Sequence, residues 1–516
     1  MVNNHFHLNN LKNLHRKLNQ SLPQSEDHSK VYDVNLSIKK EISRIVGPNN
    51  VLDSYESRLT YSYDSSPLEK RLPELVVRPA STEEVAKLVS LANIERFAII
   101  PRGSGTGLSG GSLPVENSVV VLFNHWNKIL EIDQDNFTVM VEPGVITANL
   151  QAEVEKYGLM YPPDPGSSSI STIGGNVAEN AGGLRGLKYG VTKNYVMGLE
   201  VVLPTGEIIF TGGKCVKDVA GYNIKDILIG SEGTLGIITK ILLRVIPNIE
   251  TARTFLVFYA SMEDAAQTVS EIIKSKITPS MLEFLDNTTI RCIEEYTHIG
   301  LPVETDAILL IEIDGKKSVV EEEANLIHAI CKRRNAVNIK YAESEEESIK
   351  LKKARRAAFA SLARAAQTTL SEDVAVPRSE IARLVRRIKE IGAKYNVRIG
   401  TFGHAGDGNL HPNYLTDRRD KIAFVNADKA IIEVEEAAIQ LGGTITGEHG
   451  VGLYKKRLLE KMIGSPAVRM MRMIKELMDP MNVINPGKII DFRPRCEGPL
   501  PTTREQIKEF KDIPWI

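Results

Sequence analysis

The sequence has few of the features that mark proteins of membranes, nucleic acids or oxidising compartments. Only four cysteines occur among 516 residues, without a Cys-x-x-Cys pair, so we expect a reducing compartment and no cysteine-bound iron–sulfur cluster or structural zinc. No run of eighteen apolar residues occurs, so we expect no transmembrane segment. The 64 basic residues nearly balance the 65 acidic ones without a dense basic run, so no nucleic acid is expected as a partner.

The remaining composition, 42% hydrophobic and 25% charged, is that of a globular protein. A chain of 516 residues is too long for one compact core, so we expect two or three domains. Residues 1–31 contain no acidic residue before Glu26 and lack the apolar core of a secretory signal, so they are interpreted as a polar extension. Residues 491–516 are interpreted as an irregular tail. We expect a cytoplasmic protein, which a partner could hold at a membrane.

Glycine is distributed unevenly, and this unevenness divides the chain. From about residue 70 to 245, short apolar segments alternate with long loops of glycine, serine and threonine. We expect strands at 75–77 and 98–101, and a helix between them at 82–93.

The pattern changes between about residues 252 and 395. Two successive strand–helix–strand units predict a ferredoxin-like sandwich, which commonly forms a cap over an active site. Neither unit is long enough to stand alone, so we expect one domain. Strands are expected at 254–259, 281–285, 307–313 and 337–341, and helices at 262–276 and before about 334.

A last helix is predicted close to the C-terminal tail. Ser465 is a suitable N-cap and Pro466 suits the first helical position, whereas Pro480 cannot continue a helix. Such a helix, ending near Asp479, could pack back on the first domain.

Residues 102–111 contain five glycines in ten positions, directly after a predicted strand. Glycine allows backbone N–H groups to approach and converge on an anion, and a diphosphate is the natural guest. The spacing is neither Gly-x-Gly-x-x-Gly opening a long helix nor a Walker loop. A flexible surface loop is the alternative interpretation, and this loop alone does not decide between them.

Other segments of small residues accompany this loop. They provide surfaces with few bulky side chains, which suit the lining of a long, flat ligand. These segments are at 161–166, 171–176, 180–183, 188–190 and 230–237.

Three of the ten histidines stand in two unusual glycine-rich contexts. His404 and His411 belong to Gly403-His-Ala-Gly-Asp-Gly-Asn-Leu-His-Pro-Asn, and Glu448 directly precedes His449 between two glycines. These segments are poor helix formers, so we expect loops or strand ends, where catalytic groups are commonly presented. Imidazoles with a carboxylate suit a divalent ion, although hydrogen-bonded structural histidines are the alternative.

The order of these segments resembles a known family. The similarity is to the PCMH-type FAD-binding domain of the vanillyl-alcohol oxidase superfamily, in the branch of the glycolate oxidase flavin subunit and the D-lactate and D-2-hydroxyglutarate dehydrogenases. The motifs that carry it are Pro101-Arg-Gly-Ser-Gly-Thr-Gly, Pro162-Pro-Asp-Pro, Thr172-Ile-Gly-Gly-Asn, Asn180-Ala-Gly-Gly and Gly230-Ser-Glu-Gly-Thr-Leu-Gly.

This resemblance covers about residues 40–490 and implies an α+β fold. A PCMH-type FAD-binding domain of two α+β subdomains would span 32–250. A ferredoxin-like cap and substrate domain would span 251–445, and a C-terminal helical segment at 446–490 would pack back on the FAD domain.

The cofactor implied by the resemblance is FAD. Some relatives bind flavin covalently through a histidine in the first glycine loop, but no histidine occurs between Pro101 and Asn124, so noncovalent FAD is expected. The residues implied to cradle the pyrophosphate are Arg102, Gly103, Ser104, Gly105, Thr106 and Gly107. Those implied for the rest of the cofactor are Pro165, Ser171, Thr172, Gly175, Asn180, Gly182, Gly183, Glu232 and Ile237.

The activity implied by the resemblance is oxidation of a small D-2-hydroxy acid, D-lactate or glycolate, with hydride transfer to flavin N5. An imidazole near neutrality would take the hydroxyl proton, and a metal ion on that oxygen would lower its pKa. The implied site residues are the metal ligands His404, His411 and Glu448 for zinc, iron or manganese, the general base His449, the carboxylate clamp Arg355, preferred over Arg356, and the substrate neighbour Asn413.

Two features of the sequence indicate the substrate and the electron acceptor. Ser371 stands near the position where 2-hydroxyglutarate enzymes carry a lysine, which favours a monocarboxylate over the alternative, D-2-hydroxyglutarate. No dinucleotide fingerprint for NAD occurs, so electrons are expected to pass to an electron-transfer flavoprotein, an iron–sulfur subunit or a quinone.

Three other functions stay open at this stage. The first is a non-redox alkyl-transfer synthase on the same fold, although the run of adjacent histidines of those enzymes is missing. The second is a metallohydrolase at the histidines, which leaves the glycine loops unexplained. The third is a non-catalytic electron-transfer scaffold.

Overall fold

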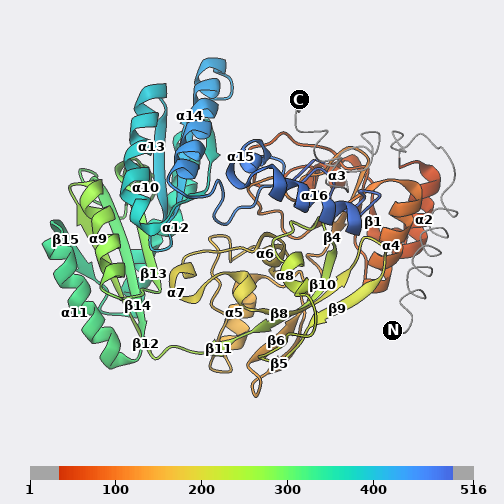
Figure 1. Cartoon of the computed structure of the whole chain (residues 1–516), viewed down its shortest axis with the longest axis horizontal. Coiled ribbons are helices and arrows are strands. Elements are labelled where there is room, and N and C mark those ends of the chain that lie inside the picture. The colour runs from red at the N-terminus through yellow and green to blue at the C-terminus, as the bar shows by residue number, and fades with distance from the viewer. Residues whose placement is uncertain (1–33, 492–516) are drawn as a thin grey trace, which may run out of the picture.

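The structure is a computed structural model that describes residues 34–491, and it has two lobes (Figure 1). The N-terminal half forms one lobe, drawn from red to yellow-green, and the cap, in green through cyan to the lighter blue of α14, forms the other. The last helices, in blue, return to the first lobe. The predicted extension at 1–31 and nearly all of the tail at 491–516 lie outside the described residues.

The first subdomain is built on a four-stranded sheet in the order β1-β2-β4-β3. β2, β4 and β3 are parallel, and β4 is buried along its whole length, as expected for a parallel strand covered on both faces. The elements are α2 (Leu36–Val46), η1 (Pro48–Asn50), β1 (Val51–Leu52), α3 (Tyr55–Thr60), β2 (Leu75–Val77), α4 (Thr82–Glu95), β3 (Ala98–Arg102) and β4 (Ser118–Leu122).

The second subdomain is built on a five-stranded antiparallel sheet in the order β5-β6-β10-β8-β9. Apolar residues of α5 and α6 pack with the sheet in one core. The elements are β5 (Ile129–Asp133), β6 (Thr138–Val141), α5 (Thr147–Glu155), α6 (Ile173–Glu179), α7 (Gly186–Tyr189), η2 (Thr192–Asn194), β8 (Val196–Val202), β9 (Ile208–Gly212), α8 (Ile224–Leu228) and β10 (Ile237–Arg244), with the separate pair β7 (Leu159–Met160) and β11 (Ile246–Pro247).

The cap contains an eight-stranded antiparallel sheet in the order β15-β12-β14-β13-β18-β19-β16, with β17 also paired to β19. Its first four strands have the predicted ferredoxin-like order. The elements are β12 (Thr251–Tyr259), α9 (Met262–Lys274), β13 (Met281–Asp286), α10 (Asn287–Thr297), β14 (Ala307–Gly315), α11 (Lys317–Arg333), β15 (Ala336–Tyr341), α12 (Glu345–Ala365), β16 (Thr368–Ser371), β17 (Val374–Ala375), η3 (Arg378–Glu380), α13 (Ile381–Tyr395), β18 (Arg398–His404), β19 (Asn409–Thr416) and α14 (Lys421–Gln440).

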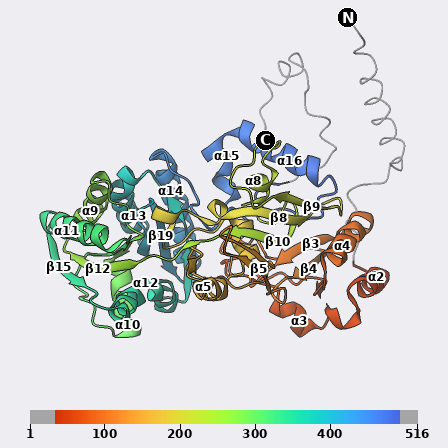
Figure 2. The same ribbon diagram turned by 90° about the horizontal axis from the view of Figure 1, so that it is seen from below.

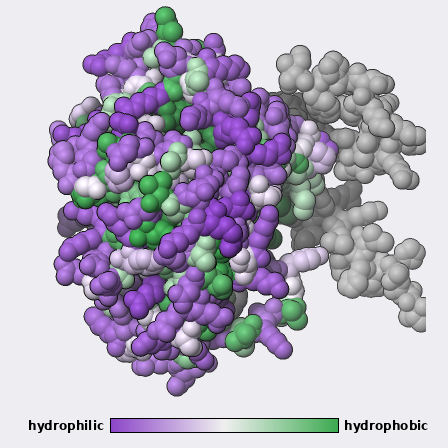
Figure 3. Space-filling view, turned by 90° about the vertical axis from the view of Figure 1, so that its left-hand side faces the viewer, coloured by the Kyte–Doolittle hydropathy of each residue, from purple (hydrophilic) through white to green (hydrophobic). Residues whose placement is uncertain are grey.

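Helices cover both faces of the cap sheet. One core contains buried residues of α9, α11, α13 and α14, and a second contains residues of α10 and α12. Figure 3 shows the end of the cap where α11 and β15 lie, and hydrophilic side chains cover most of that face. The α+β fold with a ferredoxin-like cap is therefore confirmed, and four further strands extend it.

The C-terminal segment crosses back to the first lobe. After η4 (Lys456–Leu458) and α15 (Leu459–Ile463), α16 (Ser465–Met478) lies beside the N-terminal half (Figure 2). The buried amine of Lys475 donates to Thr234 O at 2.9 Å, which fixes this position. The predicted N-cap was wrong, because Gly464 occupies that position and Ser465 already belongs to the helix. No helix within residues 34–491 is long and apolar enough to cross a bilayer.

Candidate active site

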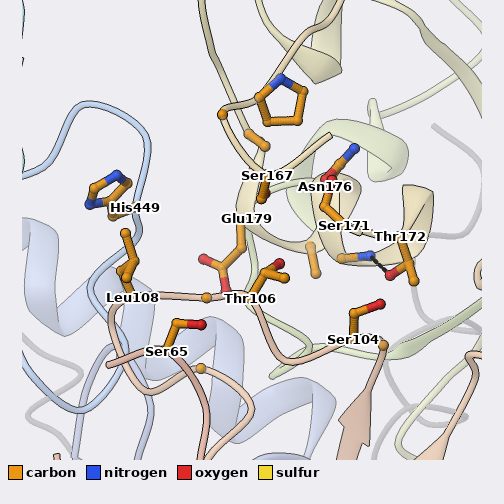
Figure 4. A pocket seen from close by; sticks show the side chains of 18 of the residues that line it. Ser65, Ser104, Thr106, Leu108, Ser167, Ser171, Thr172, Asn176, Glu179 and His449 are labelled. Carbon is orange, nitrogen blue, oxygen red and sulfur yellow. Dashed lines mark hydrogen bonds between the residues drawn. The ribbon is translucent and has the colours of Figure 1, made fainter. Parts of the chain in front are cut away.

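A cavity of about 650 Å³ lies where the two lobes meet, and both contribute to its wall. Figure 4 shows Ser104 and Thr106 on one side, Ser171 and Thr172 across from them, and His449 at one end. The predicted residues that line the cavity are Arg102, Gly103, Ser104, Gly105, Thr106, Gly107, Pro165, Ser171, Thr172, Gly175, Gly182, Glu232, Ile237, Arg355, His404, His411, Glu448 and His449.

The glycine loop approaches α6 too closely for a side chain. A Cβ on Gly103 would come within 2.2 Å of Thr172 Oγ1. Thr172 caps α6 by accepting a hydrogen bond from Gly175 N–H at 3.3 Å. Glycines and small polar residues therefore line a narrow space, which suits a flat ligand that carries phosphates.

Three predicted residues do not line the cavity. Asn180 ends α6 in a left-handed conformation and accepts from Lys193 N–H at 2.9 Å. Gly183 packs against the backbone of Asp164, where a Cβ would meet the carbonyl oxygen at 2.1 Å. Asn413 is fully buried in β19 and donates to His411 O at 2.7 Å, so it lies behind the cavity wall. In this structure these residues shape the wall, and their predicted ligand contacts stay predictions.

His404, His411 and Glu448, the three residues expected to bind a metal ion, lie close together in the structure. His404 ends β18, and His411 lies in the neighbouring strand β19, whereas Glu448 stands on the loop before η4. Glu448 Oε1 lies 3.4 Å from His404 Nε2 and 3.3 Å from His411 Nε2. Two imidazoles and one carboxylate therefore point at one small volume, the donor set that a divalent ion prefers.

Two buried carboxylates stand behind these histidines. Glu283 Oε1 lies 2.7 Å from His404 Nδ1, and Asp373 Oδ1 lies 3.7 Å from His411 Nδ1. Metal-binding histidines usually direct their second ring nitrogen to such an outer carboxylate, which fixes the tautomer and orientation.

In this cluster, neighbouring opposite charges shift the pKa values of the histidine and the carboxylate more than burial does. Burial would lower the pKa of His404, but Glu283 and Glu448 raise it well above 6.5. Burial would likewise raise the pKa of Glu448, yet His404 and His411 hold it well below 4.5. The cluster therefore stabilises positive charge at its centre, whether a proton or a metal ion supplies it.

His449 has the opposite character. Its ring stacks on His411 with 5.0 Å between centroids and 7° between planes. Burial is the main reason that its pKa falls to about 4, although Asp373 opposes this effect. His449 is therefore a neutral imidazole at physiological pH, which is the form that accepts a proton.

Arg355 is the more firmly held of the two cavity-lining arginines. Its Nε donates to Glu283 Oε2 at 2.6 Å, and its guanidinium carbon lies 4.5 Å from the centre of the Phe402 ring. Arg356 also lines the cavity and is exposed, with no ion pair to any residue between 34 and 491. Arg355 thus presents a pre-oriented cation, and Arg356 a freer one.

Sequence reasoning missed Glu283 and Asp373. Glu283 is the charged residue in the middle of a fully buried strand, Met281–Asp286, and this contrast was a usable signal. Asp373 precedes the short strand β17 without such a contrast. Only folding brings these residues to histidines more than thirty positions away.

A glycine-lined cavity closed by imidazoles, carboxylates and a guanidinium defines a cofactor-dependent enzyme, and the comparisons identify the cofactor. The profile of the FAD binding domain family matches residues 73–212, and that of the C-terminal domain of FAD linked oxidases matches residues 249–489. The small-residue lining and the constricted glycine loop fit FAD, so the protein is a flavin-dependent oxidoreductase.

Relatives narrow this class to a family. The chain is 51% identical to glycolate oxidase subunit GlcD of Bacillus subtilis (strain 168), over 88% of this chain and 96% of that one. It is 36% identical to D-lactate dehydrogenase of Anaerostipes hadrus, over 86% and 95% of the two chains. A structure of p-cresol methylhydroxylase shares the fold, with a TM-score of 0.74 and 17% identity. The match covers 90% of this chain and 99% of that one. The chain belongs to the FAD-linked oxidase family of these two relatives.

Proposed function

We propose that this enzyme oxidises a small D-2-hydroxy acid, D-lactate or glycolate, to the 2-oxo acid. The observation that carries the proposal is the placement of Arg355, His404, His411, Glu448 and His449 on the cavity that the glycine loop also lines. The names of the two relatives support the same substrate class. Bound FAD would accept a hydride from the substrate carbon.

The protein side chains divide the remaining work. The guanidinium of Arg355 would hold the substrate carboxylate, because its orientation is already fixed by Glu283. Neutral His449 would take the proton of the substrate hydroxyl. Noncovalent binding of FAD stays part of the proposal, and release of free flavin on acid precipitation would support it.

A divalent metal ion, zinc, iron or manganese, would fit between His404, His411 and Glu448. The fit rests on the convergence of both Nε2 atoms at Glu448 and on the carboxylates behind the two rings. Such an ion supplies a Lewis acid that lowers the pKa of a coordinated hydroxyl.

The size and charge of the substrate are the next question. Ser371 lines the cavity and provides no charge, which supports a monocarboxylate. Arg356 lines the same cavity with an exposed guanidinium, which favours the second candidate, D-2-hydroxyglutarate. We retain lactate or glycolate as the first proposal because Arg355 is the only one of these two arginines held by a buried partner among residues 34–491.

The electron acceptor is proposed to be a partner rather than NAD. One relative carries the word subunit in its name, which supports an assembly with an electron-transfer flavoprotein or an iron–sulfur subunit, and a quinone is the alternative. A cytoplasmic enzyme held at a membrane by its partner is consistent with this proposal.

Anaerobic titration tests the proposal directly. The purified, yellow protein is mixed with D- and L-lactate, glycolate and D-2-hydroxyglutarate, with and without a chelator, and flavin absorbance is recorded. We expect bleaching by D-lactate or glycolate and slower bleaching after chelation. Unchanged flavin with every hydroxy acid contradicts the proposal, and bleaching by D-2-hydroxyglutarate alone selects the second candidate.

A further inference from the structure

The loop at residues 446–452 carries Glu448 and His449, and its first part is hydrogen-bonded to a residue of the cap. Asp373 Oδ2 accepts the backbone N–H groups of residues 447–449 at 2.8, 2.9 and 2.9 Å, and the hydroxyl of the preceding threonine at 2.8 Å. Asp373 is fully buried. The first part of the loop is thereby tied to the cap.

The second part of the loop is hydrogen-bonded to residues of the FAD-binding half. Glu232 Oε1 accepts Val451 N–H at 2.7 Å, and Glu232 Oε2 accepts Gly452 N–H at 2.7 Å. Ser109, on the glycine loop, accepts the N–H groups of residues 453 and 454 through its carbonyl at 3.0 and 3.2 Å. The loop is therefore held between the two lobes by side chains far apart in sequence.

Two glycines make this close approach possible. Gly450 has a φ of +82°, and a Cβ there would lie 2.4 Å from Glu179 Oε2 and 2.9 Å from Glu232 Oε1. Gly452 has a φ of +51°, and a Cβ there would meet Ser109 O at 2.1 Å. Neither position tolerates a side chain while the loop keeps these bonds.

The two neighbouring carboxyl groups differ in their partners. Glu232 is 5% exposed, and each of its oxygens already accepts one N–H of the loop. Glu179 lines the same cavity, but its Oε2 is buried without a hydrogen-bond partner among residues 34–491. Of the pair, Glu232 alone is bonded to the loop.

We propose that Glu232 is a positioning residue, which sets the place of His449 and Glu448 by holding the loop that carries them, rather than a ligand of the cofactor. The loop that Asp373 and Glu232 hold spans only seven residues, 446–452. Loss of either contact would therefore shift His449, which lies between the residues that they bond. The effect on catalysis rests on the function proposed above, whereas the hold on the loop does not.

Amide hydrogen exchange of the FAD-loaded protein tests the hold itself. Glu232→Ala removes both acceptors, so we expect exchange of the amides of 451 and 452 to rise roughly tenfold or more. Glu232→Gln keeps one acceptor oxygen and should give a smaller rise. Glu312→Gln removes the charge of another buried glutamate, in β14 of the cap, and should leave these amides unchanged.

Flavin content and reduction kinetics separate positioning from cofactor binding. We expect Glu232→Gln to retain its FAD, to lose about 10- to 100-fold in the maximal rate of flavin reduction, and to change the half-saturating substrate concentration less than about threefold. If the amides of 451 and 452 stay protected from exchange in both Glu232→Ala and Glu232→Gln, the proposal is overturned. Loss of FAD while these amides stay protected also overturns it. If Glu232→Ala does not fold, Glu232→Gln decides. Failure of wild-type protein to be reduced by any hydroxy acid refutes the proposed function, while the exchange result still decides on Glu232.

Discussion

At the scale of single residues, Glu283 contacts two groups with different proposed tasks. One oxygen faces His404 Nδ1 at 2.7 Å, and the other accepts from Arg355 Nε at 2.6 Å. Burial opposes its charge, but His404 and Arg355 keep the pKa of Glu283 below 4.5. One carboxylate therefore orients both a proposed metal ligand and the proposed substrate clamp.

Glu283→Gln should weaken both tasks together. The neutral amide can accept from one partner but cannot balance two cations, so we expect metal affinity to fall about 10- to 100-fold. Half-saturation of flavin reduction by the hydroxy acid should also move to higher concentration. Metal titration and anaerobic reduction measure these effects, and Glu312→Gln is the matched buried control. Unchanged affinity for both ligands would refute this role of Glu283.

His449→Asn tests the proposed base. We expect flavin reduction by substrate to slow by about 10²- to 10⁴-fold, because proton removal loses its acceptor. The bound-flavin spectrum should persist, since the glycine loop is untouched. Stopped-flow absorbance gives the rate, and a rate equal to that of the wild type would contradict the role of His449 as the base.

The sequence predicts the first layer of this site better than the second. His404, His411, Glu448 and His449 stand in short glycine-rich motifs whose order is itself informative. Glu283 is 121 positions from His404 and belongs to an otherwise apolar strand, so no local pattern connects the two residues. Outer partners of this kind depend on strand register, which becomes visible only after folding.

At the scale of elements, the glycine loop depends on its closeness to α6. Gly103→Ala places a Cβ against Thr172 Oγ1, the hydroxyl that caps the helix. Overpacking of this kind typically costs about 1–3 kcal/mol, so we expect FAD to bind about tenfold more weakly or worse. Titration of the apoprotein with FAD measures the change.

The matched control for this variant is Gly213→Ala. A Cβ at Gly213 meets nothing within 4 Å, so FAD affinity should stay that of the wild type. Equal affinity of Gly103→Ala and Gly213→Ala would mean that the loop can move away from α6 without loss of binding.

The segment after α16 is fixed by a buried lysine with an unusual pKa. Lys488 is 2% exposed and donates to Leu113 O at 2.6 Å. Burial is the main cause that lowers its pKa to about 7, from 10.5, although Asp64 opposes the change. Between pH 7 and 10.5, the amine of Lys488 binds more protons in the unfolded chain than in the folded protein. The contribution of Lys488 to stability therefore grows as the pH rises and is lost as the pH falls toward 7.

Lys488→Met should remove this pH dependence. Between about pH 8 and 9.5, we expect the free energy of unfolding to rise more steeply with pH in the wild type than in the variant. The difference between the two slopes should reach up to about 1.4 kcal/mol per pH unit. Denaturant unfolding at several pH values measures the difference. The exposed Lys217→Met is the control, and an equal slope in both variants would contradict this account.

Predictability also differs among the elements. Strands 75–77 and 281–285 were found because their apolar runs are bounded by turns, and β2 and β13 match them within one residue. The strands β18 and β19 were not predicted, because glycine and polar residues of the site interrupt the apolar pattern there. The misplaced N-cap at Ser465 has a similar cause, since Gly464 with a φ of +83° starts the helix one residue earlier.

At the scale of the whole molecule, each lobe supplies what the other lacks. The N-terminal half provides the glycine-lined wall, and the cap provides His404, His411 and the guanidinium of Arg355 on the same cavity. The loop at 446–452 is bonded to both lobes through Asp373 and Glu232. The architecture therefore makes the site a property of the interface, and separated lobes should carry no activity.

A crystal structure of the FAD-loaded enzyme with the product pyruvate bound is the most direct test of this account. We expect the isoalloxazine ring to face His404, His411 and His449, with the keto carbon about 3–3.5 Å from flavin N5 and the carboxylate on Arg355. A ring bound elsewhere in the cavity, with these three histidines turned toward solvent, would contradict the account even if the protein were yellow.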